Sequence, residues 1–309
     1  MRVKFSFLFV PLLMVLVCWF PSSGSGAPVR IPRGLVHKNY NPRLFRGIQP
    51  GTVVYTDSNA AILEYDPSTG QRSLISKGGL LKHPYGITLL ENSDVLVGDT
   101  GAQSLIRIDK DSGQQSLFAQ NSTLGFPFGI TTDKHGDIWV ANGEALVRVD
   151  KDTAATRTIS SGQLFLAPIG VAVGEDNTAY IADAVSRIIK VNTHTGEQTL
   201  LSSGGYLVNP IGIVTVQNDL FVADSGAQKV IHISTKSGKQ TLLSAGGNLC
   251  SPVAVAIYGQ SQLLIGDPDA FNYSGCLLEV NMSNGAQSPL VTGAGEFVNP
   301  RCLVVVPSR

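Results

Sequence analysis

The chain has 309 residues, with 23 Lys and Arg balanced by 23 Asp and Glu. A balanced charge without a basic run or stripe excludes nucleic acid and an anionic membrane surface as the main partner. With 43% hydrophobic residues, the composition also excludes a disordered chain and predicts a folded protein with a sizeable core.

The N-terminal segment has the three-part pattern of a secretory signal peptide. Arg2 and Lys4 supply a cationic start, Phe5–Phe20 supply an apolar run, and Ser22–Ala27 supply small residues for cleavage. An uncleaved membrane anchor is the alternative, but the run is short for a membrane span and contains a proline. We therefore predict a signal peptide over residues 1–26, a secreted or periplasmic mature protein, and no stable membrane insertion.

Export to an oxidising compartment permits disulfides, and in a eukaryotic host it permits N-glycans. Three asparagines stand in Asn-x-Ser/Thr sequons, and they occur as Asn121-Ser-Thr, Asn272-Tyr-Ser and Asn281-Met-Ser. The sequence therefore predicts a glycoprotein if the host is eukaryotic.

After a lead-in segment at residues 27–41, residues 42–309 repeat a unit of about 42 residues. Each unit contains a proline, a variable residue and a small residue. This motif occurs as Pro84-Tyr-Gly86, Pro127-Phe-Gly129, Pro168-Ile-Gly170, Pro210-Ile-Gly212, Pro252-Val-Ala254 and Pro300-Arg-Cys302. Regular spacing of this length is typical of proteins built from stacked supersecondary units.

Three further runs complete each unit. The first of them is apolar and ends in Asp or Asn. It occurs as Val53–Asp57, Val95–Asp99, Ile138–Asn142, Ala179–Asp183, Leu220–Asp224 and Leu263–Asp267. The next run holds one charged or polar slot among apolar residues, which is typical of a half-exposed outer strand, and a fourth, more polar run follows. Four short strands per unit, six times over, predict an all-β, six-bladed β-propeller of four-stranded blades.

The strand count predicts how the ring closes. The unit that begins at Val53 starts with its second strand, so its first strand is missing. The last strand of the chain, Arg301–Val306, is a first strand that no second strand follows. We therefore predict that Arg301–Val306 is the innermost strand of the blade built from residues 53–76, which leaves no open sheet edge in the ring. Pro42-Arg-Leu copies the start of the motif and keeps a different closure possible.

Two units carry a more specific pattern. They are Pro210-Ile-Gly-Ile with Phe221-Val-Ala-Asp-Ser-Gly226, and Asp183 with Arg187-Ile-Ile-Lys-Val191. In these residues the chain resembles the NHL-repeat family, and the resemblance covers about residues 42–306. It implies a propeller fold but no single function, because the relatives include protein- and RNA-binding modules, extracellular parts of receptors, amidating lyases and lactone hydrolases.

A carboxylate recurs at the end of the second strand, and Asn142 takes its place in one unit. The carboxylates are Asp57, Asp99, Asp183, Asp224 and Asp267. A catalytic acid is expected in one unit only, whereas these residues occupy the same position in nearly every unit. We therefore predict a structural role, in which these side chains accept backbone N–H groups in the turn after the second strand.

Metal chemistry has little support in the sequence. The resemblance to amidating lyases implies a histidine-ligated metal on the axis, but only His83 lies at the mouth of the ring in the repeat frame. We predict no metal site and no cofactor. The resemblance to lactone hydrolases implies calcium held by oxygen ligands, which Asn209 and Asn299 could supply, so calcium is expected only if the protein is an enzyme.

The sixth unit contains an insertion, Pro268-Asp-Ala-Phe-Asn-Tyr-Ser-Gly-Cys276. In a four-stranded blade, the loop before the first strand and the loop between the second and third strands share a face. Cys250, Cys276 and Cys302 should therefore lie at or near one face. We predict a disulfide between Cys250 and Cys276, with a bond between Cys276 and Cys302 as the alternative.

Aromatic and polar residues gather on the same face and form a candidate ligand-binding rim. The rim residues are His83, Tyr85, Asn209, Asp269, Phe271, Tyr273, Asn299 and Arg301. The alternative is that the aromatic residues of the insertion only cover the disulfide.

Two functions fit this architecture. The first is a secreted or periplasmic module that binds a protein, peptide or glycan on the rim. The second is a lyase or lactonase-like hydrolase acting in the central funnel. The clean repeat favours the first, and the sequence identifies no catalytic residue.

Overall fold

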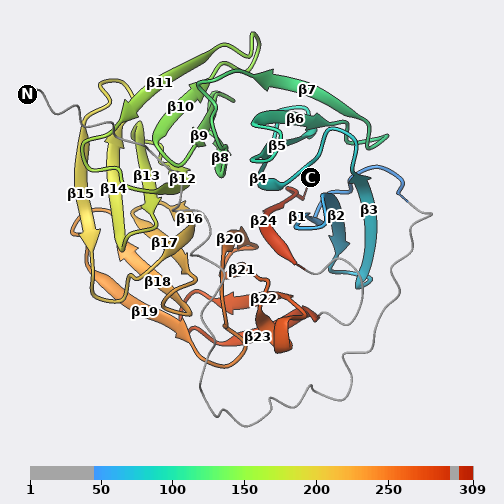
Figure 1. Cartoon of the computed structure of the whole chain (residues 1–309). Helices are drawn as coiled ribbons and strands as arrows, with labels where there is room; N and C mark the ends of the chain where they lie inside the picture. Colours follow the sequence, from blue (N-terminus) through green and yellow to red (C-terminus); the bar gives the residue numbers. More distant parts are fainter. Residues whose placement is uncertain (1–44, 293–298, 309) are drawn as a thin grey trace, which may run out of the picture. The chain divides into compact units, whose positions relative to one another are not determined.

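The computed structural model describes residues 45–292 and 299–308. These residues form six four-stranded antiparallel sheets arranged around an axis, so the predicted six-bladed propeller is confirmed (Figure 1). The predicted signal peptide, the lead-in segment and Pro42 lie outside the described residues.

The first three blades take their strands in chain order, except that the last strand of the chain belongs to the first blade. From the axis outward, blade 1 contains β24 (Pro300–Val305), β1 (Val53–Asp57), β2 (Ala61–Asp66) and β3 (Gln71–Lys77). Blade 2 contains β4 (Pro84–Leu89), β5 (Val95–Asp99), β6 (Ser104–Ile108) and β7 (Gln115–Gln120). Blade 3 contains β8 (Gly129–Thr132), β9 (Ile138–Ala141), β10 (Ala145–Val149) and β11 (Thr156–Ser161).

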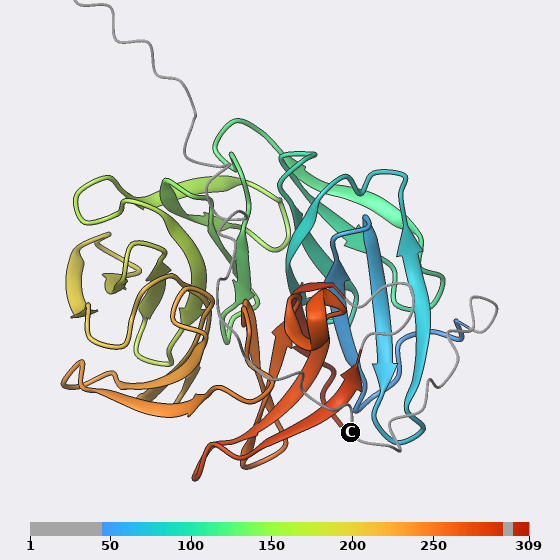
Figure 2. The same ribbon diagram turned by 60° about the horizontal axis from the view of Figure 1, so that its bottom comes forward.

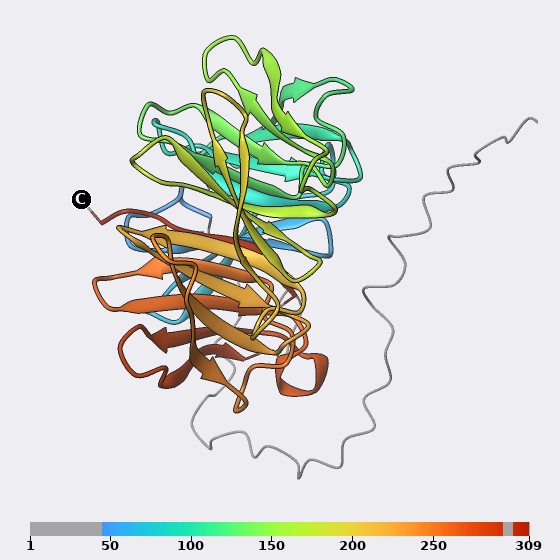
Figure 3. The same cartoon turned by 90° about the vertical axis from the view of Figure 1, so that its left-hand side faces the viewer.

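The other three blades repeat this order without exception. Blade 4 contains β12 (Pro168–Val173), β13 (Thr178–Asp183), β14 (Arg187–Asn192) and β15 (Gln198–Ser203). Blade 5 contains β16 (Pro210–Val216), β17 (Asp219–Asp224), β18 (Lys229–Ser234) and β19 (Gln240–Ala245). Blade 6 contains β20 (Ala254–Tyr258), β21 (Gln262–Asp267), β22 (Cys276–Asn281) and β23 (Gln287–Thr292). Figure 3 shows these sheets from the side.

The first strands of neighbouring blades contact one another around the axis, and the small residue of the repeat motif explains how. A Cβ atom placed on Gly170 of β12 would collide with the carbonyl oxygen of Ile211 in β16. The motif therefore requires a small residue at the point where the backbones of adjacent blades touch.

The ring closes as predicted. β24 pairs antiparallel with β1, with Val305 opposite Val53, Leu303 opposite Tyr55 and Cys302 opposite Thr56. The strand begins at Pro300, one residue before the predicted start. Blade 1 thus joins residues from the two ends of the described chain, and its inner strand contacts β4 and β20 on either side.

The core consists of six apolar layers, each between two neighbouring blades. In the layer between blades 3 and 4, Trp139 and Leu146 pack with Ile181 and Ile189. Second strands are buried on both sheet faces because a blade covers each side, which explains their uninterrupted apolar sequence.

The third strands are more buried than predicted. In β6, every residue except Arg107 is buried, and Arg107 forms an ion pair with the buried Asp94. The prediction of a half-exposed third strand was wrong because the neighbouring blades cover both of its faces, as Ile106 packs toward blade 1 and Leu105 toward blade 3. The outermost strand of the blade is the fourth one, and β15 and β19 accordingly mix exposed, partly buried and buried positions.

A single helical turn, α1 (Ala270–Tyr273), forms in the insertion, and it is the only α-helix among the described residues (Figure 2). No helix was predicted there, because one turn is too short to produce a periodic pattern in the sequence. Within the described residues, no helix has the length and hydropathy needed to span a membrane.

Candidate functional site

Two sets of loops share one end of the propeller, as the sequence analysis predicted. The segment before the first strand accepts hydrogen bonds from the segment after the second strand. Thr100 N–H donates to the His83 carbonyl oxygen at 3.0 Å, and Ser225 N–H donates to that of Asn209 at 3.1 Å. We call this end the loop face; it comprises the segments before each first strand and those between each second and third strand.

The repeated carboxylates hold the loop face together. The Asp224 carboxylate is fully buried, and it accepts the backbone N–H groups of Val208, Asn209 and Ala227, each at 2.8 Å. The predicted structural role is therefore confirmed, and it is wider than predicted. The carboxylate fixes the turn after its own strand and also the segment that crosses over from the preceding blade. Asp57, Asp99 and Asp267 accept backbone N–H groups from both segments in the same way. Asp183 accepts only those of Leu166 and Ala167, and its Oδ1 forms an ion pair with Arg187.

The variable residue of the repeat motif lies in a β-bulge. Pro84 pairs with Asp99 and Gly86 with Gly98, so Tyr85 is the extra residue in β4. The register shifts at the same point in blades 1, 4 and 5. Bulges redirect side chains, and this bulge lies where each inner strand leaves the loop face. We call the six variable residues the axial mouth, and they are Tyr85, Phe128, Ile169, Ile211, Val253 and Arg301.

Aromatic rings occupy one side of the axial mouth. Tyr85 of blade 2 meets Phe128 of blade 3 edge to face, with ring centroids 5.4 Å apart. Phe126, in the segment before β8, stacks on Phe128 at 6.3 Å and is 40% exposed. The three rings form a ledge from the mouth onto the loop face, with one ring open to solvent.

Exposed aliphatic side chains extend this ledge across blades 4 and 5. Leu166 is 64% exposed and Val208 is 50% exposed, and each lies two residues before the proline of its repeat motif. Val185, in the loop between β13 and β14, is also exposed. The sequence analysis missed all three, and it missed Phe126 and Phe128. The repeat frame places these residues on the loop face, but their exposure depends on packing that the sequence does not show.

The predicted rim residues outside the insertion lie on the loop face or at the mouth. His83 is exposed and donates its backbone N–H to Asp99. Asn209 is half-buried and donates from Nδ2 to Ser225 Oγ at 2.9 Å. Asn299 and Arg301 are half-buried on the segment that enters β24. The structure thus brings together the residues that the repeat frame assigned to one end of the molecule.

The insertion is more tightly packed than a free binding loop. Asp269 N–H donates to the Asp267 carboxylate at 3.0 Å. Phe271 is half-buried and packs against the apolar cluster that contains Leu249 and Cys276. The side chain of Tyr273 lies outside the described part of the structure. Packing accounts for what is described of Phe271, so the exposed apolar surface lies over blades 3 to 5 instead.

The structure leaves Cys250, Cys276 and Cys302 as free thiols, so neither predicted disulfide is present in it. Cys276 is buried in the apolar cluster shared by blades 5 and 6, whereas Cys302 packs in the layer between blades 1 and 2. Burial raises the pKa of the Cys276 thiol well above its usual range, with smaller contributions from Asp267 and Cys250. In this environment Cys276 acts as a small apolar side chain.

The described histidines lie on different elements, as the repeat frame predicted. His83 is on the loop face, whereas His194 lies in the turn between β14 and β15. His232, on β18, bonds through Nε2 to Asp219 at 2.7 Å. Among the described residues, no three His, Cys, Asp or Glu side chains are grouped closely enough to hold a metal ion.

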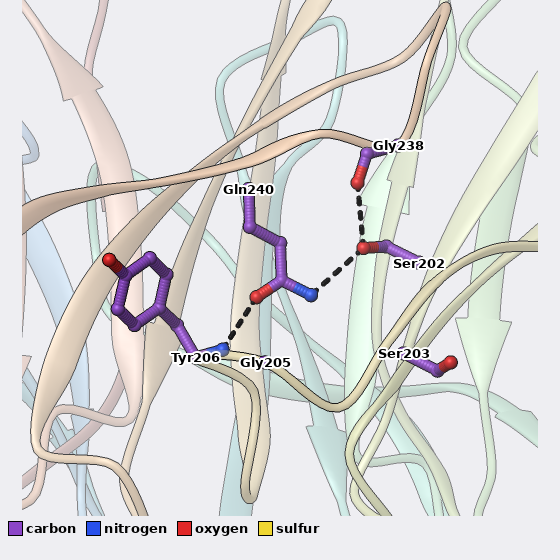
Figure 4. A pocket seen from close by; sticks show the side chains of 6 residues that line it. All are labelled: Ser202, Ser203, Gly205, Tyr206, Gly238 and Gln240. Carbon is purple, nitrogen blue, oxygen red and sulfur yellow. Dashed lines mark hydrogen bonds between the residues drawn. The ribbon is translucent and has the colours of Figure 1, made fainter.

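A shallow pocket of about 550 Å³ lies away from the mouth, between the outer strands of blades 4 and 5 (Figure 4). Gln240 spans it, accepting from Tyr206 N–H at 2.7 Å and donating to Ser202 Oγ at 3.0 Å. Ser202 in turn donates to the Gly238 carbonyl oxygen at 2.8 Å. Because the polar groups that line it bond to one another, the pocket is a seam between blades rather than a preformed ligand site.

Known proteins resemble this chain in structure and not in sequence. No family model matches the chain, and no curated protein matches it in sequence. A chain of a nidogen/laminin complex superimposes with a TM-score of 0.70 at 16% identity, over 84% of this chain and 99% of that one. A streptogramin B lyase gives 0.62 at 15% identity, over 82% and 83%. Virginiamycin B lyase from Staphylococcus aureus gives 0.61 at 16% identity, over 84% and 89%.

The likeness is one of fold. A propeller built on a shared framework presents different loops at its two ends, so chemistry and recognition depend on the residues that those loops carry. In this propeller the loop face carries large apolar side chains around a partly aromatic mouth. Such a surface can bury apolar groups of a partner and orient them with a few polar contacts.

Proposed function

We propose that this protein is an exported propeller of the NHL type that binds a protein ligand through its axial mouth and loop face. The observation that carries the proposal is the exposure of three apolar side chains on the loop face, since Phe126, Leu166 and Val208 are 40%, 64% and 50% exposed. Large apolar groups that stay exposed around a mouth are a feature of interaction surfaces, because association removes them from water.

The shape of the surface supports a protein as the ligand. The apolar side chains stand on separate loops of blades 3, 4 and 5 instead of lining one enclosed cavity. A broad surface of this kind suits a partner that offers several side chains at once. The similar nidogen/laminin chain comes from a complex of two proteins, which is consistent with this use of the fold.

The N-terminal pattern and the sequons support the exported location. Asn121 is exposed in the segment before β8, where a glycan would meet solvent. N-terminal sequencing of protein recovered outside the cell tests export, which requires a mature chain that starts at Ala27. A chain that keeps its apolar N-terminus and stays with the cell would contradict it.

Binding is tested with a display library of short random peptides selected on the purified protein. We expect peptides rich in apolar residues whose binding weakens about tenfold when Phe126 or Leu166 is replaced by Ser, because each substitution removes a large apolar contact. The matched control is Leu117→Ser, since Leu117 is 53% exposed but lies on the outer strand β7. Equal losses in all three variants, or no selected peptide, would contradict the proposal.

A further inference from the structure

The axial mouth has one charged member. Five of its six residues are aromatic or aliphatic, and the sixth is Arg301. Arg301 is half-buried, and among the described residues its guanidinium has no ion pair and no hydrogen bond. A guanidinium has five N–H donors, and no nitrogen of Arg301 is a buried unsatisfied atom, so these donors reach solvent and can be offered to a ligand.

A second polar group on the same segment also lacks a partner. The Asn299 Oδ1 atom is buried, and within the described part of the chain no donor reaches it. Its counterpart in blade 5, Asn209, bonds to Ser225 Oγ. The entry to β24 therefore holds a donor and a buried acceptor, two residues apart, that no other described residue pairs with.

Hydrogen bonds fix the Arg301 segment beside the aromatic ledge. Thr56 of β1 accepts the backbone N–H of Cys302 at 3.0 Å and donates its hydroxyl to the Tyr85 carbonyl oxygen at 2.7 Å. One threonine thus joins the residue after Arg301 in β24 to Tyr85 in β4. The unpartnered guanidinium and the ring pair of Tyr85 and Phe128 therefore belong to adjacent inner strands.

The acidic groups of the loop face do not compensate this charge. The carboxylates of the repeat are fully buried and accept backbone N–H groups. Lys82 and His83 are exposed on the neighbouring segment of blade 2, and Lys229 is half-buried in blade 5. Asp269 and Glu144 are the acids that the described loops leave accessible. These two lysines and two carboxylates balance one another, so the charge of Arg301 itself makes the mouth positive.

From these observations we infer that Arg301 recognises a carboxylate of the protein ligand, carried next to a large apolar side chain that packs on Tyr85 and Phe128. This inference rests on the proposed function and specifies its ligand. A guanidinium holds a carboxylate through two parallel N–H bonds, which are stronger in a partly dehydrated mouth than in water. A lysine ammonium cannot form these two parallel N–H bonds, so Arg301→Lys should bind the carboxylate more weakly than the wild type.

The test uses the same library of random peptides on four full-length proteins, which are the wild type, Arg301→Gln, Arg301→Lys and Phe126→Ser. We expect the wild type to enrich peptides in which Asp or Glu adjoins an aromatic or branched apolar residue. A synthetic copy of an enriched peptide should bind Arg301→Gln and Arg301→Lys about tenfold more weakly, and its amide counterpart should bind the wild type equally weakly. Matching thermal unfolding curves show that the variants are folded.

The results distinguish a failure of the inference about Arg301 from a failure of the proposed function. Peptides that lose affinity on Phe126→Ser but show no acidic preference, or bind Arg301→Gln as well as the wild type, would overturn the inference and leave the proposed function standing. If no selected peptide responds to Phe126→Ser, both fail. Glu296 lies outside the described residues, so a Glu296→Gln variant tests whether its carboxylate competes for Arg301. Acidic peptides that bind this variant more tightly than the wild type would show that Arg301 is already paired, and would overturn the inference that it is free.

Discussion

Neighbouring blades meet along seams between their fourth strands, and two of these seams differ, since one is polar and the other is apolar. Between blades 4 and 5, Gln240 binds Ser202 Oγ and the Gly204 carbonyl oxygen, and Ser202 binds the Gly238 carbonyl oxygen. The seams between blades 1 and 2, 3 and 4, and 5 and 6 repeat this network through Gln115, Gln198 and Gln287. A polar belt therefore joins the fourth strands at four of the six seams.

The seam between blades 2 and 3 lacks the belt. Ala119 stands in the place of the serine, Thr156 in that of the glutamine, and Ala154 in that of the glycine. Ala154 packs instead against the apolar layer that contains Ala119, with Phe118 beside it. Asn142 also replaces the repeated Asp in blade 3. A Cβ atom at the glycine of the polar seam would collide with the facing carbonyl oxygen, whereas Ala154 carries one, so we expect the apolar seam to be wider.

The largest effect is expected from removing the loop-face carboxylate of blade 5, a blade that borders polar seams on both sides. Asp224→Ala leaves three partly buried N–H groups without their acceptor and should lower the free energy of unfolding by about 3 kcal/mol. Asn142→Ala in blade 3, which borders the apolar seam, should cost less. Asn142 also makes three hydrogen bonds, but its amide is neutral, and hydrogen bonds to a charged group are stronger. Urea unfolding of both variants measures the difference, and equal losses would contradict the comparison.

A smaller loss is expected from closing the polar seam with a methyl group. Gly238 has φ +68°, and a Cβ atom there would collide with the Leu201 carbonyl oxygen, so Gly238→Ala should cost about 2 kcal/mol. Ala154 adopts φ 57° at the apolar seam without such a clash. Ala154→Gly should therefore leave the melting temperature unchanged or slightly higher. A neutral Gly238→Ala would show that the seams are equally spaced.

The smallest effect is a change in pH dependence at the loop face. Burial is the main reason that the pKa of Asp267 lies above its ordinary value of 3.8, while the N–H groups of Cys250 and Ser251 oppose the shift. The folded state then binds the proton more tightly than the unfolded state. This carboxyl therefore adds stability as pH falls from neutral through its raised pKa toward about 3.8, and Asp267→Asn should remove that gain.

Thermal unfolding is measured from pH 7 to pH 4, and the gain is the difference between the wild type and Asp267→Asn in how the melting temperature changes with pH. Asp109 is the control of opposite sign, because a hydrogen bond from the Ser112 hydroxyl lowers the pKa of its carboxyl. Stability from Asp109 is present above its unfolded pKa and is lost as pH falls through the lowered one. Parallel slopes for the wild type and Asp267→Asn would contradict the assignment.

The architecture could be predicted from the sequence because its determinants are local and recur. The proline of each motif, the small residue two positions later and the Asp that ends the second strand mark the blade, and the strand at Val53–Asp57 was predicted to the residue. The closure of the ring by the last strand could be predicted by counting the strands of each unit. The third strand was predicted too exposed, because a charged slot such as Arg107 resembles an exposed position until its partner Asp94 is known.

The candidate site could be predicted only in part. The repeat frame placed His83, Tyr85 and Arg301 at one end, but it gave no measure of exposure. Leu166 and Val208 look like core residues in sequence, and only the packing of the segment before each inner strand shows that they face solvent. The disulfide was inferred from a shared face, whereas packing decides that Cys276 points into an apolar cluster.

The pairing of β24 with β1 also constrains the order in which the protein can assemble. The partners Val53 and Val305 lie at opposite ends of the described chain, and a ribosome delivers β24 after every other described strand. Blade 1 must therefore wait with an unpaired inner edge while the other blades form, and such distant pairing is slow. Joining the ends by a short linker and opening the chain between two blades would let this pair form early.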